Sequence, residues 1–139
     1  MLKLFLSIFG IILLLGIWQS AFATNGDVIL TSPVMVNTSG DKITDFHVNQ
    51  QIGIESNLTN NGKIEHKFTY LVQVMNSAGK TEYLEGFSAS MLPNQSFTAS
   101  QVWMPKTPGQ YTVQVFVWDS LSSAIPLTDV LQTQIIINQ

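Results

Sequence analysis

Apolar and polar residues alternate along most of this chain after its first two dozen positions. The clearest case is a run in which every second residue is apolar: Tyr111, Val113, Val115 and Val117. A period of two places side chains on one face of a β-strand, because successive strand residues point to opposite faces. The same alternation occurs at 68–75 and, less strictly, at 50–58. We therefore predict half-buried strands in these three segments.

Shorter apolar segments complete the pattern. Val28–Leu30 and Val34–Val36 are short strand candidates, and Pro33 confines the second to a sheet edge because proline cannot donate to a β-ladder. Residues 81–87 predict a further edge strand, and residues 95–103 and 129–137 predict two more strands. Turn-forming residues separate the segments about every 8–12 positions. This spacing predicts an all-β fold, an immunoglobulin-like antiparallel β-sandwich of about seven strands.

The predicted core follows from the same alternation. Its members share the parity that turns them toward the opposite sheet: Ile52, Ile54, Phe68, Tyr70, Val72, Val74, Tyr111, Val113, Val115, Val117, Leu131, Ile135 and Ile137.

Pro108-Gly109 stands immediately before the most regular strand, and Tyr111 opens it. This order resembles a tyrosine corner, in which the hydroxyl of a tyrosine at the start of a strand bonds back to the preceding backbone. A tyrosine that merely lies at the mouth of a strand is the alternative.

The amino terminus has a different composition. A basic start at Lys3 is followed by an apolar run over 4–18 and the small-x-small site Ala21-Phe22-Ala23. These features predict a signal peptide at 1–23 with cleavage after Ala23, a domain at 24–139, and a secreted or extracytoplasmic, cell-surface location. An uncleaved N-terminal anchor is the alternative, and only a retained leader would give the chain a membrane partner.

Composition excludes several functions. The chain has no cysteine, which rules out thiol catalysis, thiolate metal sites and blue-copper centres. Its net charge is −3 and it contains no arginine, the residue best suited to bidentate phosphate and guanine contacts. We therefore expect no nucleic-acid partner.

Several short motifs resemble a known family. They are Trp103-x-Pro105, Pro108-Gly109-x-Tyr111-Thr112, Phe116-Val117-Trp118 and Phe68-x-Tyr70-Leu71-Val72-Gln73. As a set they are similar to an immunoglobulin-like, adhesion-related (CARDB-like) domain of exported proteins from ammonia-oxidising archaea. The resemblance implies a non-catalytic binding or structural module at the cell surface that acts through protein–protein contacts. It supplies no catalytic residue.

Residues with catalytic or metal-binding chemistry are few. His47 and His66 could join Glu65, or a methionine such as Met91 or Met104, in a metal site of the copper-carrier type, because thioethers suit Cu(I). Isolated rim histidines and packing methionines are the simpler interpretation. The carboxylates Asp41, Asp45, Glu82 and Glu85 show no spacing typical of acid–base catalysis or of a calcium loop.

No nucleophile elbow and no phosphate-binding glycine loop occurs in the sequence. We therefore predict no enzyme activity, no cofactor and no committed metal site. The copper carrier remains one alternative function. A carbohydrate-binding module that stacks sugars on an exposed Trp or Tyr remains another.

Three Asn-x-Ser/Thr sequons begin at Asn37, Asn57 and Asn94. In an exported chain they are glycosylation candidates. Asn94, at a predicted turn, is the best of them, and Asn57, inside a predicted strand, is the poorest.

A candidate interface follows from the parity of the predicted strands. If Tyr111 and Val117 face the core, Phe116 and Trp118 face outward, and Leu71 and Val130 join them from the two neighbouring strands. An apolar patch of Leu71, Phe116, Trp118 and Val130 would favour a protein partner or self-association. The alternative is that Leu121, Ile125 and Leu127 fold back over Trp118 as a satellite core.

Overall fold

The computed structural model describes residues 26–139, so the predicted signal peptide at 1–23 lies outside the described residues. The described part contains nine strands and no helix that could span a membrane. The strands are β1 (Val28–Leu30), β2 (Val34–Val36), β3 (Phe46–His47), β4 (Ile52–Asn60), β5 (His66–Asn76), β6 (Thr81–Met91), β7 (Ser96–Trp103), β8 (Gly109–Trp118) and β9 (Leu131–Asn138).

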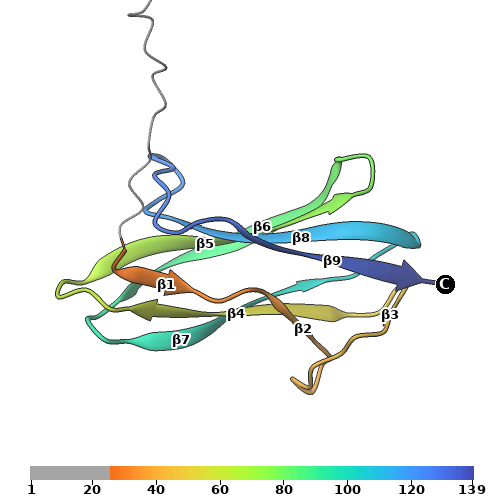
Figure 1. Ribbon diagram of the computed structural model, residues 1–139, viewed down its shortest axis with the longest axis horizontal. Coiled ribbons are helices and arrows are strands. Elements are labelled where there is room, and N and C mark those ends of the chain that lie inside the picture. The colour runs from red at the N-terminus through yellow and green to blue at the C-terminus, as the bar shows by residue number, and fades with distance from the viewer. Residues whose placement is uncertain (1–25) are drawn as a thin grey trace, which may run out of the picture.

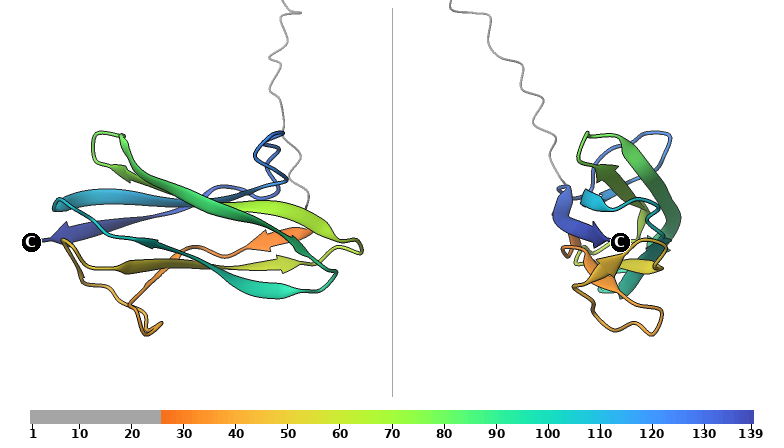
Figure 2. Two further views of the ribbon diagram at one scale, coloured as in Figure 1. Left: turned by 180° about the vertical axis from the view of Figure 1, so that it is seen from behind. Right: turned by 90° about the vertical axis from the view of Figure 1, so that its right-hand side faces the viewer.

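The strands form two sheets that pack face to face, which confirms the predicted immunoglobulin-like sandwich (Figures 1 and 2). In the four-stranded sheet, β1 and β2 both pair with one side of β4 and β7 pairs with the other. The five-stranded sheet has the order β3-β9-β8-β5-β6. β8 therefore lies between β5 and β9, as expected for an immunoglobulin-like strand order.

The strand count and one strand direction differ from the prediction. Nine strands form rather than about seven, and β3 runs parallel to β9 within a sheet that is otherwise antiparallel. Phe46 and His47 are too short a segment to show any alternation. Their pairing with Ile137 and Asn138 depends on the tertiary fold, which brings the far end of the chain beside them.

The core has the expected composition. Of the thirteen predicted residues, twelve are buried, and only Leu131 at the start of β9 is partly exposed. The β5–β8 register places core-facing residues opposite one another, for example Tyr70 opposite Val117 and Val72 opposite Val115. Because opposite residues in a pleated ladder share a face, the alternation in each strand adds to that of its neighbour and produces one continuous apolar layer.

The tyrosine corner is confirmed. The Tyr111 hydroxyl donates to the backbone carbonyl of Thr107 at 2.9 Å and also contacts the Thr107 hydroxyl at 2.7 Å. Gly109 has φ of 140°, a conformation that side-chain-bearing residues rarely adopt. Trp103 packs edge-on against the Tyr111 ring with a centroid separation of 5.0 Å.

Tyr70, by contrast, is a core tyrosine without a hydroxyl partner. Neither its hydroxyl nor the buried Ser56 hydroxyl has a hydrogen-bond partner among the described residues. Burial raises the pKa of Tyr70 to about 12; Ser56 lies near enough to oppose that shift, but too poorly placed for a well-formed hydrogen bond. The tyrosine therefore contributes to stability through its ring.

Candidate interaction surface

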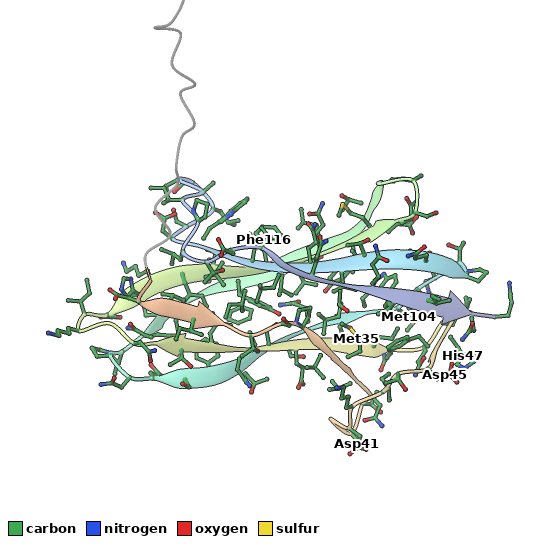
Figure 3. The ribbon with its side chains drawn as sticks, viewed as in Figure 1. Met35, Asp41, Asp45, His47, Met104 and Phe116 are labelled. Carbon is green, nitrogen blue, oxygen red and sulfur yellow. The ribbon has the colours of Figure 1, made fainter. Side chains whose placement is uncertain are left out.

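Phe116 and Trp118 lie on the outer face of the five-stranded sheet, as predicted, because the alternate residues of β8 fill the core. Their rings are tilted by 52° with centroids 5.3 Å apart, and both are partly exposed. Figure 3 shows Phe116 directed away from the opposite sheet. This aromatic pair forms the centre of the candidate surface.

Leu71 does not join that surface as an exposed residue. It lies opposite Phe116 on β5 but is only 7% exposed. The reason is Gly86 on the next strand, which pairs with Leu71 and has no side chain. The Cδ2 atom of Leu71 lies 2.9 Å from the position that a Cβ of Gly86 would take, so the leucine leans over the glycine. Leu71 thus faces outward with Phe116, as predicted, but it is covered and does not belong to an exposed patch.

The loop after β8 agrees only in part with the predicted alternative, a satellite core over Trp118. Leu127 does fold back: it is buried, and its N–H donates to the Val117 carbonyl at 2.8 Å. Pro126 forms a β-bridge beside Trp118. Leu121 and Ile125, however, stay 64% and 55% exposed, so they do not form a buried satellite core.

Val130, just before β9, is 54% exposed, as the parity argument required. We name the resulting surface the apolar corner. Its members are Phe116, Trp118, Leu121, Ile125 and Val130.

Asp119 orders the loop that carries two members of the corner. Its Oδ1 accepts hydrogen bonds from the N–H groups of Ser120 and Ile125, at 2.6 and 3.0 Å, and from the Ser123 hydroxyl. The Ser123 bond, followed by these backbone bonds, lowers the pKa of Asp119 below its ordinary value of 3.8. The loop therefore holds Leu121 and Ile125 in one arrangement at neutral pH, although their side chains face outward.

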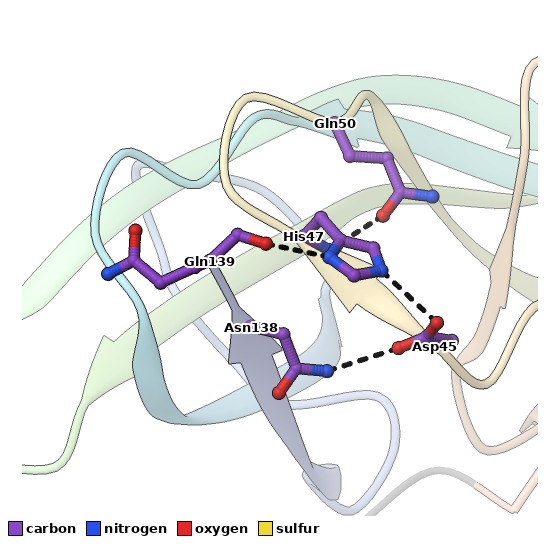
Figure 4. A network of polar contacts seen from close by, with 5 residues as sticks. All are labelled: Asp45, His47, Gln50, Asn138 and Gln139. Atoms are coloured by element: carbon purple, nitrogen blue, oxygen red, sulfur yellow. Dashed lines mark hydrogen bonds and ion pairs between the residues drawn. The ribbon is translucent and has the colours of Figure 1, made fainter.

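A polar network closes the other end of the sheet (Figure 4). The ring of His47 joins the backbone oxygen of Gln139 through Nδ1 at 2.9 Å and the Asp45 carboxylate through Nε2 at 3.1 Å. Asn138 donates to the second Asp45 oxygen at 3.1 Å. The Gln139 oxygen and then the Asp45 carboxylate raise the pKa of His47, and His47 in turn lowers the pKa of Asp45. The network ties β3 to the last residues of the chain.

The histidines are not brought together. His66 opens β5 and lies 3.6 Å from an Asp27 oxygen, at the end of the sandwich opposite His47 (Figures 1 and 3). Met91 is fully buried, and Met104 accepts a contact from the Lys106 ammonium at 3.2 Å. Within residues 26–139, no three side chains among His, Asp and Glu are grouped so as to hold a metal ion.

The sequons differ in the freedom of their amides. Asn94 is exposed in the β6–β7 turn with φ of 63°, and its side chain makes no hydrogen bond to residues 26–139. The side-chain amide of Asn37 donates to the Asp41 carboxylate and accepts from the Ser39 N–H. The side-chain oxygen of Asn57 accepts from the Thr98 hydroxyl. Glycosylation at Asn94, Asn37 and Asn57 stays a prediction, in that order of preference.

Comparisons with solved structures define the fold class. The CARDB domain of a Pyrococcus furiosus protein, solved in complex with di-metal ions, is similar with a TM-score of 0.55 and 18% identity, over 79% of this chain and 89% of that one. A β-glucosidase from Erythrobacter marinus is similar with a TM-score of 0.60 and 8% identity, over 80% of this chain but only 15% of the enzyme. The resemblance to CARDB-like domains is thereby confirmed for the fold, whereas the enzyme shares only one domain with this chain.

Sequence comparison gives the family. The family model described as S-layer A-like matches residues 22–138, so the chain belongs to the S-layer A-like family. No curated protein matches the chain. The family and the fold together define a structural module of the cell surface, of a kind that is typically non-catalytic.

Proposed function

We propose that this domain is a non-catalytic building module of a cell-surface layer and that the apolar corner binds a neighbouring protein of that layer. Membership of the S-layer A-like family supports the cell-surface role. The observation that carries the binding role is the exposure of Leu121, Ile125 and Val130 beside the Phe116–Trp118 pair.

The construction of the corner supports binding rather than incidental exposure. Single exposed apolar residues are common on soluble proteins, but contiguous groups of them usually mark an interface. Here the loop is fixed by Asp119 and Leu127, so the exposed side chains are presented from an ordered backbone. A preordered surface loses little conformational entropy when a partner binds.

The predicted alternatives are less well supported. A sugar-stacking platform needs an open aromatic face, whereas Trp118 is partly covered and tilted against Phe116. A copper carrier needs its ligands together, and His47 and His66 lie at opposite ends of the sandwich. The apolar corner needs no rearrangement to act.

The test is the paired substitution Phe116→Ser and Trp118→Ser in the purified protein. We expect higher-order association to weaken by about 30-fold, the effect of losing one interface hot spot of about 2 kcal/mol. Thermal unfolding should change little. The control is Ile136→Ser, which removes a more exposed apolar side chain from the outer face of β9, outside the corner. A large fall in melting temperature with unchanged association would show that the aromatic pair is only a satellite core.

A further inference from the structure

β6 is the free edge of the five-stranded sheet. Its eleven residues, Thr81–Met91, pair with β5 on one side only. In the end-on view of Figure 2, β6 forms the outer margin of the sandwich. An edge strand directs the N–H and C=O groups of every second residue away from its sheet, where they can pair with another strand.

Natural sheets usually protect such an edge with lysine, proline, a bulge or a very short strand. β6 contains no lysine, arginine or proline, and its charged residues are Glu82 and Glu85. Its one irregularity, opposite Val74 and Met75 of β5, leaves the strand regular from Tyr83 to Met91. The residues at its far end are small, so no bulky side chain hinders the approach of another backbone.

The inner face of β6 is also incompletely covered. Tyr83 and Phe87 pack against the core but remain partly exposed. Phe87 extends an aromatic cluster, with its ring centroid 5.7 Å from Tyr70 and 6.1 Å from Phe68. β7, the long edge of the other sheet, has Ala99 and Trp103 buried on its inner side and gains less from a neighbour. Glu85 of β6 faces the same side as Tyr83 and Phe87, because it lies opposite the buried Val72. The open backbone of β6 thus coincides with a partly exposed aromatic row that one carboxylate interrupts.

We propose that two copies of this chain associate by antiparallel pairing of their β6 strands, centred on Gly86, so that their two five-stranded sheets become one continuous sheet. This inference rests on the proposed cell-surface role and adds a second contact. A two-fold pair closes on itself, so an extended layer needs at least one further interface, which the apolar corner would supply.

The register follows from charge and length. Gly86 is the midpoint of β6, so centring the two-fold axis there pairs residues 83–89 of one copy with residues 89–83 of the other, within the regular part of the strand. Each Glu85 then lies opposite Phe87 of the second copy, and each Leu84 opposite Ser88. Centring on Glu85 would instead oppose two carboxylates, which is unfavourable. The glycine places no side chain at the axis itself.

The experiment uses charge at the two outward-facing positions that this register brings together. Leu84 and Ser88 are exposed on the outer face of the sheet. Leu84→Lys combined with Ser88→Lys would oppose like charges twice across the axis. Leu84→Lys combined with Ser88→Glu would oppose unlike charges twice. Both variants lose the same Ser88–Thr69 hydrogen bond, so each is the matched control of the other.

Sedimentation equilibrium of each protein up to millimolar concentration gives the outcome. We expect the unmodified chain to dimerise, the Lys/Lys variant to be at least tenfold weaker, and the Lys/Glu variant to recover dimerisation. A monomeric unmodified chain, or two variants that behave alike, would overturn the proposal. The corner variants should still form the pair, so a failure of the corner and a failure of β6 pairing give different results.

Discussion

The two edges of the five-stranded sheet are built in opposite ways. At one edge β3 is only two residues long, and the side chains of Asp45 and His47 tie it to Asn138 and Gln139. At the other edge β6 runs for eleven residues with neither a charged lysine nor a proline. Short length prevents edge-to-edge pairing at β3, whereas β6 is long and its charged side chains are limited to Glu82 and Glu85. One edge is therefore closed, and the other is left available.

The apolar corner and the β6 edge differ in how far their residues reveal them in the sequence. The apolar corner is visible as large hydrophobic residues with outward parity. The β6 edge carries its binding capacity in backbone groups, which every residue has. Its distinguishing features are the lack of lysine and proline and an edge position, which the sequence predicted for residues 81–87 and the fold extends to Met91.

The largest effect is expected at the open edge itself, from Gly86→Ala. A Cβ at this position would lie 2.1 Å from the Tyr70 carbonyl oxygen, a backbone atom that cannot turn aside. We expect a loss of about 3 kcal/mol in the free energy of unfolding, typical of a forced overpacking. Urea denaturation measures it.

Gly53→Ala is the control for that substitution. There the new methyl group would meet the Cγ2 atom of the Val36 side chain at 2.6 Å, and a side chain can shift further than a backbone carbonyl. A cost for Gly86→Ala no greater than that for Gly53→Ala would mean that β6 is not held tightly against β5.

The next effect distinguishes two tyrosines. Tyr111→Phe removes the hydroxyl that bonds to Thr107 and fixes the start of β8 beside β9, on the closed side of the sheet. It should cost about 1 kcal/mol of stability, the net value of one hydrogen bond. Thermal or chemical unfolding of the single variant is sufficient to measure it.

Tyr70→Phe is the matched substitution in the core. Its hydroxyl is buried without a partner, so its removal should leave stability unchanged or slightly higher. Equal losses at the two tyrosines would show that the Tyr70 hydroxyl does make a stabilising bond.

The smallest effect concerns pH and the closed edge. The pKa of His47 is raised above 6.5 in the folded protein. Its contribution to stability is therefore fully present below pH 6.5 and is lost as pH rises through the folded pKa. Because the pKa of Asp45 is lowered below 3.8, its contribution is present above that value and is lost as pH falls through its folded pKa. The network should therefore hold β3 best between about pH 4 and 6.5.

NMR titration of the His47 ring gives its pKa directly. Amide exchange at Val48, whose N–H donates to the Asn138 carbonyl, reports the docking of β3. Its protection should decrease modestly above neutral pH in the native protein. In the His47→Ala variant the pH dependence should disappear. A folded His47 pKa below 6.5 would contradict this account of the closed edge.

Much of the fold could be predicted because one signal, the period of two, is local. It located the faces of β4, β5, β8 and β9, while short apolar runs located β1 and β2. It could not show β3, whose bond from His47 to Gln139 spans 92 positions in the sequence. Nor could it extend β6 to Met91, because Ser88, Ala89 and Ser90 carry no apolar alternation.

For the candidate site, too, the sequence predicted which side chains face outward but not which of them are covered. The outward parity of Phe116, Trp118 and Val130 follows from β8 and β9 alone, and it is confirmed. The burial of Leu71 depends on Gly86, which lies on another strand, and a sequence pattern contains no information on that contact. The interface role of these residues and the leader at 1–23 both stay predictions.

The difference between the edges is tested most directly by hydrogen–deuterium exchange measured at low and at high protein concentration. Pairing would satisfy the outward N–H groups of β6, so its amides between Tyr83 and Met91 should become more protected as concentration rises. The amides of β3 and β7 should not change. Protection that rises equally at all three strands, or at none of them, would contradict the claim that β6 is the open edge of this domain.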